Sequence, residues 1–556
     1  MLLAISVLPL AILQPLRVCP AQRAASVMMS AVETDAESDT ADDSDDWSAV
    51  DAWLAESSQG AAAAMEEGSL NHRWESTSKG HMHEHFVERN AKMREWAALG
   101  ASERLETNLQ RLGFSVPSTT QAAAFAHVLG GENLLLADAN GMGKTLAYVA
   151  PIVQKLWEWE ERDGKTPPGE VRTIIIVPTN DLAQQVLELA REVGYRSLRA
   201  SVATGEHSWK TQRTRMKGGL DLLVGTMGRL VGHVSPRGME PSFSIDGLRL
   251  LVVDEASSLY QGKAPSYMSK NAASRQGAAA DAFDETSYDV QEFRRQPLLQ
   301  EPPLAMWKFL RGELPQECST VMVSSALPDG VSEQIREDVP AIVEVVGKGI
   351  HTTRAGVPLE LVDVETSQAG RESIFEAKLR ELRDCLAGSR HSLVLCNNPE
   401  SCARIERALR DEPFACGDRA CPIPGLTPTL LCFHGSLTAE RRENSLKSFR
   451  RATLNQWEKT AMKSAAEGEL PPARCLIATG SSVRGLDFTA GEERQLDHVV
   501  LWDFPPNAKA YLARVGCATR GTRPAARVTA LALRSQLAFA KAMLANDEAG
   551  SAHELY

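Results

Sequence analysis

The chain has 556 residues, of which 43% are hydrophobic and 24% charged, and its formal net charge is −12. This length exceeds one compact domain, and two to three domains are expected. The acidity is local, because residues 33–67 hold twelve Asp and Glu and no Lys or Arg, so the remaining chain is close to neutral and a nucleic-acid partner is not excluded.

The ten cysteines are scattered, which is typical of a reducing compartment and not of a disulfide framework. Cys416 and Cys421 form the one close pair, and no second pair completes a zinc site. The cluster "HMHEH" at 81–85 could bind a metal, but a solvated polar linker is the favoured interpretation.

The N-terminus combines a short apolar run with an Ala/Ser-rich stretch that contains Arg17 and Arg23 and no acid before Glu33. This composition predicts a targeting segment over residues 1–30, for a plastid or a mitochondrion, with an unstructured tail of a nuclear or cytoplasmic protein as the alternative. The apolar run is too short to span a bilayer, and no membrane partner is expected. Residues 31–95 are acidic and lack apolar periodicity, which predicts a disordered extension.

From about Trp96 onward, short apolar runs alternate with helix-length segments. Runs of this kind predict buried strands of parallel sheets with crossover helices, hence an α/β fold with two domains. We expect domain 1 over 96–347, domain 2 over 352–540 and a tail over 541–556. The predicted strands of domain 1 are 133–137, 173–178, 221–225, 248–253 and 320–325, and those of domain 2 are 392–396, 430–433, 475–478, 498–502 and 528–533.

The stretch "ADANGMGKTLAY" follows the first predicted strand and opens a helical segment. Glycines at 141 and 143 let backbone N–H groups surround phosphate oxygens, and the helix N-terminus favours anions. Lys144 can then reach the β- and γ-phosphates of a nucleotide, and Thr145 can ligate Mg²⁺. Asp138 stands where the general pattern has its first glycine.

A carboxylate pair, Asp254 and Glu255, ends the very apolar run "LLVVDEASSLY". Two carboxylates at a strand end would be unfavourable without a function. Asp254 is expected to hold Mg²⁺, and Glu255 to orient or deprotonate the attacking water. Together with Lys144 and Thr145, the pair predicts a nucleoside triphosphatase.

The ordered motifs resemble those of a DEAD-box RNA helicase, a family of superfamily 2, over residues 96–533. The quoted segments are "GFSVPSTTQ" (113–121), "VPTNDLA" (177–183), "GTMGRL" (225–230), "SSALP" (324–328), "CFHGSLTAERR" (432–442), "IATGSSVRGLD" (477–487) and "LWDFP" (501–505). The resemblance implies two RecA-like domains that close around ATP-Mg²⁺ and single-stranded or structured RNA, which is gripped through its backbone.

Carried over by position, the resemblance implies three sets of residues. The ATP-binding set is Trp96, Phe114, Ser118, Gln121, Asn140, Gly141, Met142, Gly143, Lys144, Thr145 and Asp487. The RNA-binding set is Pro178, Thr179, Gly205, Thr226, Arg229, His434, Gly435 and Thr479. The catalytic set is Lys144, Asp254, Glu255 and Arg520, with Arg520 in the place of the arginine finger.

Five positions depart from the family pattern in motifs II (254–257), III (324–326), V (477–487) and VI (513–520), and Asn180 stands in place of an arginine outside these motifs. They are Ser257 for an Asp, Ala326 for a Thr, Gly480 for an Asp, Ala513 for a His and Cys517 for an Arg. The changes at 257 and 326 remove both partners of one link, which is less unfavourable than leaving one partner unpaired. Loss of an arginine finger lowers the rate of hydrolysis by a factor on the order of 10³–10⁵. Because Arg520 remains in that place, we expect hydrolysis to be weakened by the other changes but not abolished.

These motifs favour an ATP-dependent RNA helicase or RNA-stimulated ATPase that acts on RNA or on RNA–protein particles. The alternative is an ATP-dependent RNA clamp or scaffold with little helicase activity, and a DNA-directed helicase is disfavoured by the "HGSLTAERR" stretch. A monomer is expected, with ribosomal or other RNA-particle proteins as further partners. The motifs do not specify which RNA is bound.

Overall fold

The computed structural model describes residues 95–549 except 196, 236–239, 261–301, 348, 354–356, 365–372, 387–388, 412–428, 451–472, 487, 489–495 and 520–525. The predicted targeting segment, the acidic extension up to residue 94, the "HMHEH" cluster and the Cys416–Cys421 pair lie outside the described residues. Within the described part, no helix combines the length and apolarity needed to cross a bilayer.

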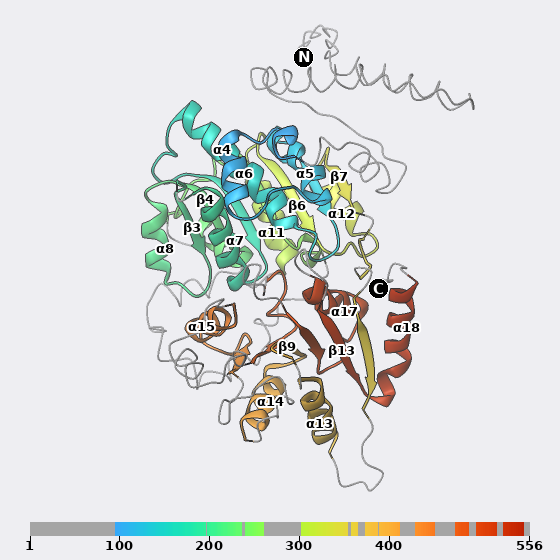
Figure 1. Ribbon diagram of the computed structural model, residues 1–556. Coiled ribbons are helices and arrows are strands. Elements are labelled where there is room, and N and C mark those ends of the chain that lie inside the picture. The colour runs from blue at the N-terminus through green and yellow to red at the C-terminus, as the bar shows by residue number, and fades with distance from the viewer. Residues whose placement is uncertain are drawn as a thin grey trace, which may run out of the picture. The chain divides into compact units, whose positions relative to one another are not determined.

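Domain 1 is built on a seven-stranded sheet in which every neighbouring pair is parallel (Figure 1). The strand order is β3-β4-β2-β5-β6-β1-β7. Its strands are β1 (Leu134–Ala137), β2 (Val171–Val177), β3 (Ala200–Ala203), β4 (Leu220–Thr226), β5 (Leu250–Val253), β6 (Ser319–Ser324) and β7 (Val343–Val346).

Helices cover both faces of this sheet because its strands are apolar on both sides. One face packs against α4 (Glu103–Arg111), α5 (Thr119–Gly130), α6 (Lys144–Asp163) and α7 (Asn180–Val193). The other packs against α9 (Met227–Val234), α11 (Pro303–Gly312) and α12 (Val331–Asp338). The domain also contains α8 (Trp209–Met216) and the short 3-10 helices η2 (Ala97–Leu99) and η3 (Ala256–Ser258).

Domain 2 is built on a six-stranded parallel sheet with the order β10-β11-β9-β12-β13-β8. Its strands are β8 (Leu359–Asp363), β9 (His391–Cys396), β10 (Thr429–Phe433), β11 (Arg474–Thr479), β12 (His498–Leu501) and β13 (Arg527–Ala532). One face packs against α13 (Ile374–Leu386) and α14 (Pro399–Asp411). The other packs against α15 (Ala439–Arg450), α17 (Ala508–Val515) and α18 (Leu537–Glu548), and η8 (Gly516–Thr519) and η9 (Arg534–Gln536) complete the domain.

The α/β fold with two parallel sheets is confirmed, and all ten predicted strands are present. The sequence analysis missed β3, β7 and β8. The strand β3 consists of four small or short residues, "ASVA", and β7 and β8 are partly exposed edge strands that carry Glu344 and Glu360. The predicted end of domain 2 at residue 540 falls inside α18, whose Ala540 and Met543 belong to the core.

Candidate functional site

The loop between β1 and α6 is folded around the ammonium of its own lysine. Lys144 Nζ donates to the carbonyls of Asp138 and Ala139, at 2.8 Å each. Gly141 and Gly143 adopt left-handed φ values of 83° and 81°, which glycine accepts without strain. The loop therefore places a positive charge and the N-terminus of α6 in one place, which is the arrangement that phosphate groups favour.

Asp138, at the position of the missing first glycine, is fixed by its neighbours. It is 5% exposed, and its carboxylate accepts from Thr120 Oγ1 at 2.5 Å and from Ala139 N at 2.7 Å. A Cβ at Gly347, just after β7, would lie 2.3 Å from Asp138 Cγ. The aspartate is therefore accommodated by α5 on one side and by a glycine on the other.

The segment 113–121 contacts the phosphate loop directly. Ser118 and Gln121 form the capping box that begins α5. The Ser118 hydroxyl donates to the Met142 carbonyl at 3.0 Å, and the Gln121 amide donates to the Gly143 carbonyl at 3.3 Å. A Cβ at Gly143 would lie 2.5 Å from Gln121 Nε2, and the left-handed φ of this residue also favours glycine.

The two aromatic residues predicted to contact ATP lie in different environments. Phe114 is 36% exposed, whereas Trp96 is fully buried and packs against Phe125 with ring centroids 5.9 Å apart. The Trp96 indole N–H donates to the Phe114 carbonyl at 2.8 Å. Trp96 thus supports the Phe114 backbone, and its ring would have to leave the core to stack on a base.

The carboxylate pair lies at the end of β5, beside β6 and close to the phosphate loop. Asp254 Oδ2 accepts from Tyr148 of α6 at 2.9 Å. Burial, and then the neighbouring Glu255 charge, raise the pKa of Asp254 to about 6. Glu255 adopts φ 53°, a left-handed conformation that few non-glycine residues take, and both its carboxylate oxygens accept from Ser325 Oγ at 2.8 Å. Two adjacent carboxylates at such an edge suit a hard cation.

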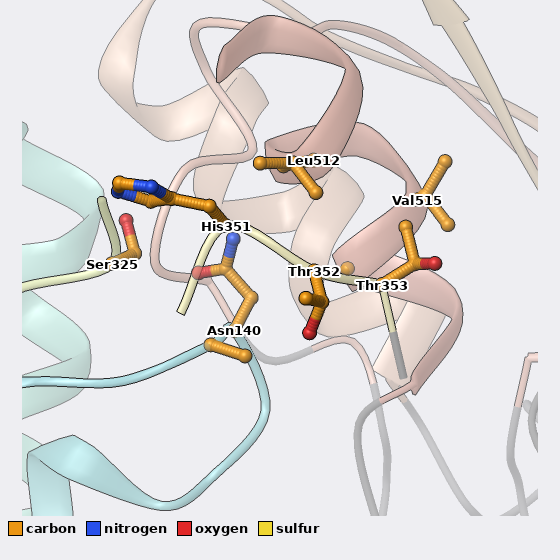
Figure 2. Close-up of a pocket in the computed structure, with 9 residues that line it drawn as sticks. Asn140, Ser325, His351, Thr352, Thr353, Leu512 and Val515 are labelled. Atoms are coloured by element: carbon orange, nitrogen blue, oxygen red, sulfur yellow. The ribbon is translucent and has the colours of Figure 1, made fainter. Parts of the chain in front are cut away.

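A narrow pocket adjoins the phosphate loop, with a cavity volume of about 10 Å³ (Figure 2). This volume is about that of one water molecule. Its lining consists of Ala139, Asn140, Ser325, His351, Thr352, Thr353, Leu512, Val515 and Gly516. Residues 351–353, which follow domain 1 in the chain, therefore line this pocket together with residues of the phosphate loop and of α17. Lys144, Asp254 and Glu255 do not line this pocket.

The residues predicted to bind RNA lie at the carboxyl ends of strands, beside the nucleotide residues. In domain 1 they follow β2, β3 and β4, which are neighbours in the sheet, whereas the nucleotide residues follow β1, β5 and β6. In domain 2 they follow the neighbouring strands β10 and β11. The carboxyl edge of the domain 1 sheet is thus divided into two adjacent sections.

Individual RNA-side residues differ in accessibility. Pro178, Gly205 and Gly435 are exposed, and Thr179 is half-buried and caps the N-terminus of α7. His434 is 6% exposed, and its buried Nδ1 has no hydrogen-bond partner among the described residues. The remaining positions are Thr226 and Arg229, half-buried at the start of α9, and Thr479, which is buried and bonded to Ser482.

An arginine of α15 meets two acids of domain 1 on this side. Arg442 is 7% exposed and forms ion pairs with Glu206 and, at 3.4 Å, with Asp181. Asn180, which replaces an arginine of the family pattern, donates to Glu206 at 3.1 Å. The section predicted to bind RNA therefore contains a carboxylate that is neutralised within the protein.

The departures from the family pattern are packed into the two domains. Ser257 is fully buried and Ala326 is 3% exposed. Cys517 is 2% exposed, and its thiol donates to the Ala513 carbonyl at 3.5 Å. A Cβ at Gly480 would lie 2.6 Å from Arg514 Nε, so this guanidinium occupies the space that a side chain at 480 would need.

Two predicted site residues, Asp487 and Arg520, lie outside the described residues. Conversely, the structure adds Tyr148, Ser325 and Arg442 to the site. Ser325 and Arg442 lie within the quoted segments 324–328 and 432–442, whereas Tyr148 lies in no quoted motif apart from the end of the phosphate-loop stretch. The sequence did not reveal their roles, because the partner of each lies at least 70 residues away in the chain.

Comparisons with known proteins agree with this geometry. Residues 118–276 match the family model described as DEAD/DEAH box helicase. The "DEAD-box ATP-dependent RNA helicase 50" of Oryza sativa subsp. japonica is 27% identical over 81% of this chain, and its namesake in Arabidopsis thaliana is 28% identical over 82%. The chain spans 60% and 50% of the lengths of these two relatives.

Among solved structures, S. cerevisiae Dbp5 bound to RNA and ADP BeF3 matches with a TM-score of 0.57 and 16% identity, over 82% of this chain and 93% of that chain. The two parallel sheets are therefore RecA-like domains arranged in tandem. The chain carries a DEAD/DEAH box helicase domain over residues 118–276, and the resemblance to DEAD-box RNA helicases that the motifs indicated is confirmed.

Proposed function

We propose that this protein is an ATP-dependent RNA helicase or RNA-stimulated ATPase of the DEAD-box type. The observation that carries the proposal is the assembly of Lys144, Asp254 and Glu255 at the ends of β1 and β5, beside a second section formed by the ends of β2, β3 and β4. Such an edge can hold a nucleotide and a strand of RNA side by side. The names of the relatives support the same activity.

In this proposal the chain's own residues act on a bound ATP as follows. Lys144 leaves its two carbonyl partners for the phosphates, and Gln121 and Ser118 keep the loop backbone in place through Gly143 and Met142. Glu255, oriented by Ser325, positions the attacking water. Thr145 and Asp254 would hold Mg²⁺, which would neutralise charge on the phosphates.

Hydrolysis is proposed to be slower than in relatives that keep the full motif VI. Positions 513 and 517 carry no polar side chain able to reach a γ-phosphate, and Cys517 is buried in domain 2. Arg520 is proposed as the remaining finger. The second candidate function, an ATP-dependent RNA clamp, is favoured by the joint loss at 257, 326, 480, 513 and 517.

Steady-state ATPase with and without single-stranded RNA separates the two, with Lys144→Ala as the blank. RNA-stimulated turnover well above the blank supports the ATPase and helicase. Turnover equal to the blank, combined with RNA retained only in the presence of ATP, would establish the clamp instead. A strand-displacement assay on a short duplex then tests whether strands are separated or only bound.

Localisation and assembly are further proposals, supported by the sequence alone. We propose delivery to a plastid or mitochondrion through residues 1–30, action as a monomer, and RNA-particle proteins as partners. A fluorescent fusion with and without residues 1–30, together with N-terminal sequencing of the mature protein, tests the first. A cytoplasmic or nuclear signal from the full-length fusion would overturn it.

A further inference from the structure

The fourth residue of the "DEAS" segment is contacted by a lysine of domain 2. Ser257 lies in η3, directly after the carboxylate pair, and is fully buried. Lys509 Nζ donates to Ser257 Oγ at 3.4 Å, across 252 residues of sequence. Lys509 is half-buried on α17. The contact joins domain 2 to the segment that carries Glu255.

The position of Lys509 on its helix explains why it reaches this segment. Lys509 and Ala513 are four residues apart on α17, so they share one face of the helix. The resemblance to the family places a histidine at 513, and alanine cannot span a gap between domains. The four-carbon stem of a lysine one turn earlier can do so, and serine at 257 leaves room for its ammonium.

The other basic residue of α17 is committed elsewhere. Arg514 donates to the Asp503 carbonyl at 2.7 Å and to the Asn397 side chain, both within domain 2. In the described part of α17 and η8, Lys509 is thus the basic residue that forms a hydrogen bond to the "DEAS" segment, through Ser257.

The charges around Lys509 agree with a functional position. Burial lowers the pKa of Lys509 to about 8, the Glu255 carboxylate opposes that decrease, and Arg484 adds to it. An ammonium beside the catalytic carboxylate and a buried hydroxyl is stabilised chiefly when domain 2 is docked on domain 1. The positive charge of Lys509 therefore acts on Glu255 when domain 2 is docked.

We propose that Lys509 is a positioning residue of the ATPase, which couples docking of domain 2 to the placement of Glu255 by holding η3 through Ser257. This inference rests on the proposed function. From the preceding helical turn, Lys509 supplies an interdomain contact that the short side chain of Ala513 cannot make.

The test compares Lys509→Ala, Lys509→Arg and the control Lys541→Ala, which removes an exposed lysine of α18. Lys509→Ala should lower RNA-stimulated kcat by about 10- to 100-fold, the range expected when one hydrogen bond to a charged group is lost. KM for ATP should change less than about threefold, because the hydrogen bond to Ser257 acts on the segment that carries Glu255 and not on the loop predicted to bind the phosphates. Lys509→Arg should restore most of the rate, and Lys541→Ala should match the wild type.

The pH profile distinguishes positioning from a merely structural role. The groups that face Lys509 are Ser257 and Glu255 from the β5–η3 segment and Arg484 from the loop after β11. Wild-type kcat should fall as pH rises above about 8, and Lys509→Arg should remain flat there because arginine keeps its charge.

A double-mutant cycle with Ser257→Ala completes the experiment. The proposal expects the double variant to be no slower than Lys509→Ala alone, because both changes remove one contact. Additive losses, or kinetics of Lys509→Ala equal to Lys541→Ala, would overturn it. If wild-type turnover equals the Lys144→Ala blank, the proposed function fails separately. Lys509 is then judged by ATP-dependent RNA retention, which Lys509→Ala should weaken and Lys509→Arg restore; unchanged retention would also overturn it.

Discussion

The carboxyl edges of the two sheets have diverged to different extents. In domain 1 the nucleotide residues keep the types that the family pattern requires, and Gln121, Ser118 and Ser325 hold them through direct bonds. In domain 2 the corresponding edge has lost polar side chains at 480, 513 and 517, and the vacated space is filled by Arg514 and by core packing. The difference teaches that the residue types predicted to hold ATP are retained in domain 1, while positions of domain 2 that the family pattern assigns to contacts with the γ-phosphate and with domain 1 carry other residues.

The largest expected effect tests whether domain 1 is catalytically complete. Glu255→Gln keeps the shape of the side chain and its contact with Ser325 but removes the general base, so RNA-stimulated turnover should fall by about 10²–10⁴-fold. ATP-dependent RNA binding should persist. Steady-state ATPase and a filter-binding assay measure the two quantities, and turnover within tenfold of the wild type would mean that another group activates the water.

Restoring the family residue at 517 should not restore the family rate. Cys517 is 2% exposed within the core of domain 2, so an arginine there must either enter that core or displace η8. Overpacking and burial of a charge predict a loss of at least about 2 kcal/mol in the free energy of unfolding. Urea unfolding and ATPase assays on Cys517→Arg, with Cys517→Ala as the matched control, measure both effects. A stable, faster enzyme would show that position 517 still reaches the nucleotide.

The interiors of the two domains each contain a buried histidine, so the free energy of unfolding of both domains should fall at acid pH. Burial lowers the pKa of His233 in domain 1 to about 3 and that of His498 in domain 2 to about 4. Both values lie below the unfolded value of about 6.5, so the unfolded chain binds more protons and stability is lost as pH falls below 6.5. From pH 7 to pH 5 each histidine should reduce the free energy of unfolding by about 2 kcal/mol.

Urea unfolding at both pH values, on the wild type and on His233→Gln and His498→Gln, measures this loss. Each substitution should remove its own share of the acid sensitivity. Equal pH dependence in all three proteins would mean that neither histidine is responsible.

The smallest expected effect concerns RNA. Glu206 places a carboxylate in the section predicted to bind phosphates and holds Arg442. Glu206→Gln removes that charge and leaves Arg442 with Asp181 as its ion-pair partner, so affinity for single-stranded RNA should rise about 1.5- to 5-fold, the range of a single weak charge interaction. Fluorescence anisotropy at fixed salt measures it, with Glu188→Gln on the exposed face of α7 as control. Weaker binding would show that the ion pair organises the RNA site.

Most strands of the two sheets and the nucleotide site of domain 1 could be predicted from the sequence, because both depend on local patterns. Apolar runs revealed ten strands, and the glycines around Lys144 and the pair after β5 revealed the nucleotide site. The edge strands β3, β7 and β8 were not predicted, since short or half-polar strands lack a continuous apolar run.

The contacts between domains could not be predicted. Lys509 with Ser257 and Arg442 with Glu206 join residues more than 200 positions apart, and a lysine or an arginine on a helix has no local feature that names its partner. The burial of Trp96 likewise depends on tertiary packing against Phe125. Motif spacing locates a residue along the chain, whereas its accessibility is decided by what covers it.

Gly347 belongs to neither the ATP-binding nor the RNA-binding set predicted from the sequence, yet its position beside Asp138 has a genetic consequence. Any side chain at 347 would collide with the carboxylate that holds Thr120 and the start of the phosphate loop. A saturation screen for loss of function should therefore score this position as intolerant to every substitution, at a level usually seen only for catalytic residues. The segment that leaves domain 1 for domain 2 begins at this glycine, and its sequence is constrained by the nucleotide site that it leaves behind.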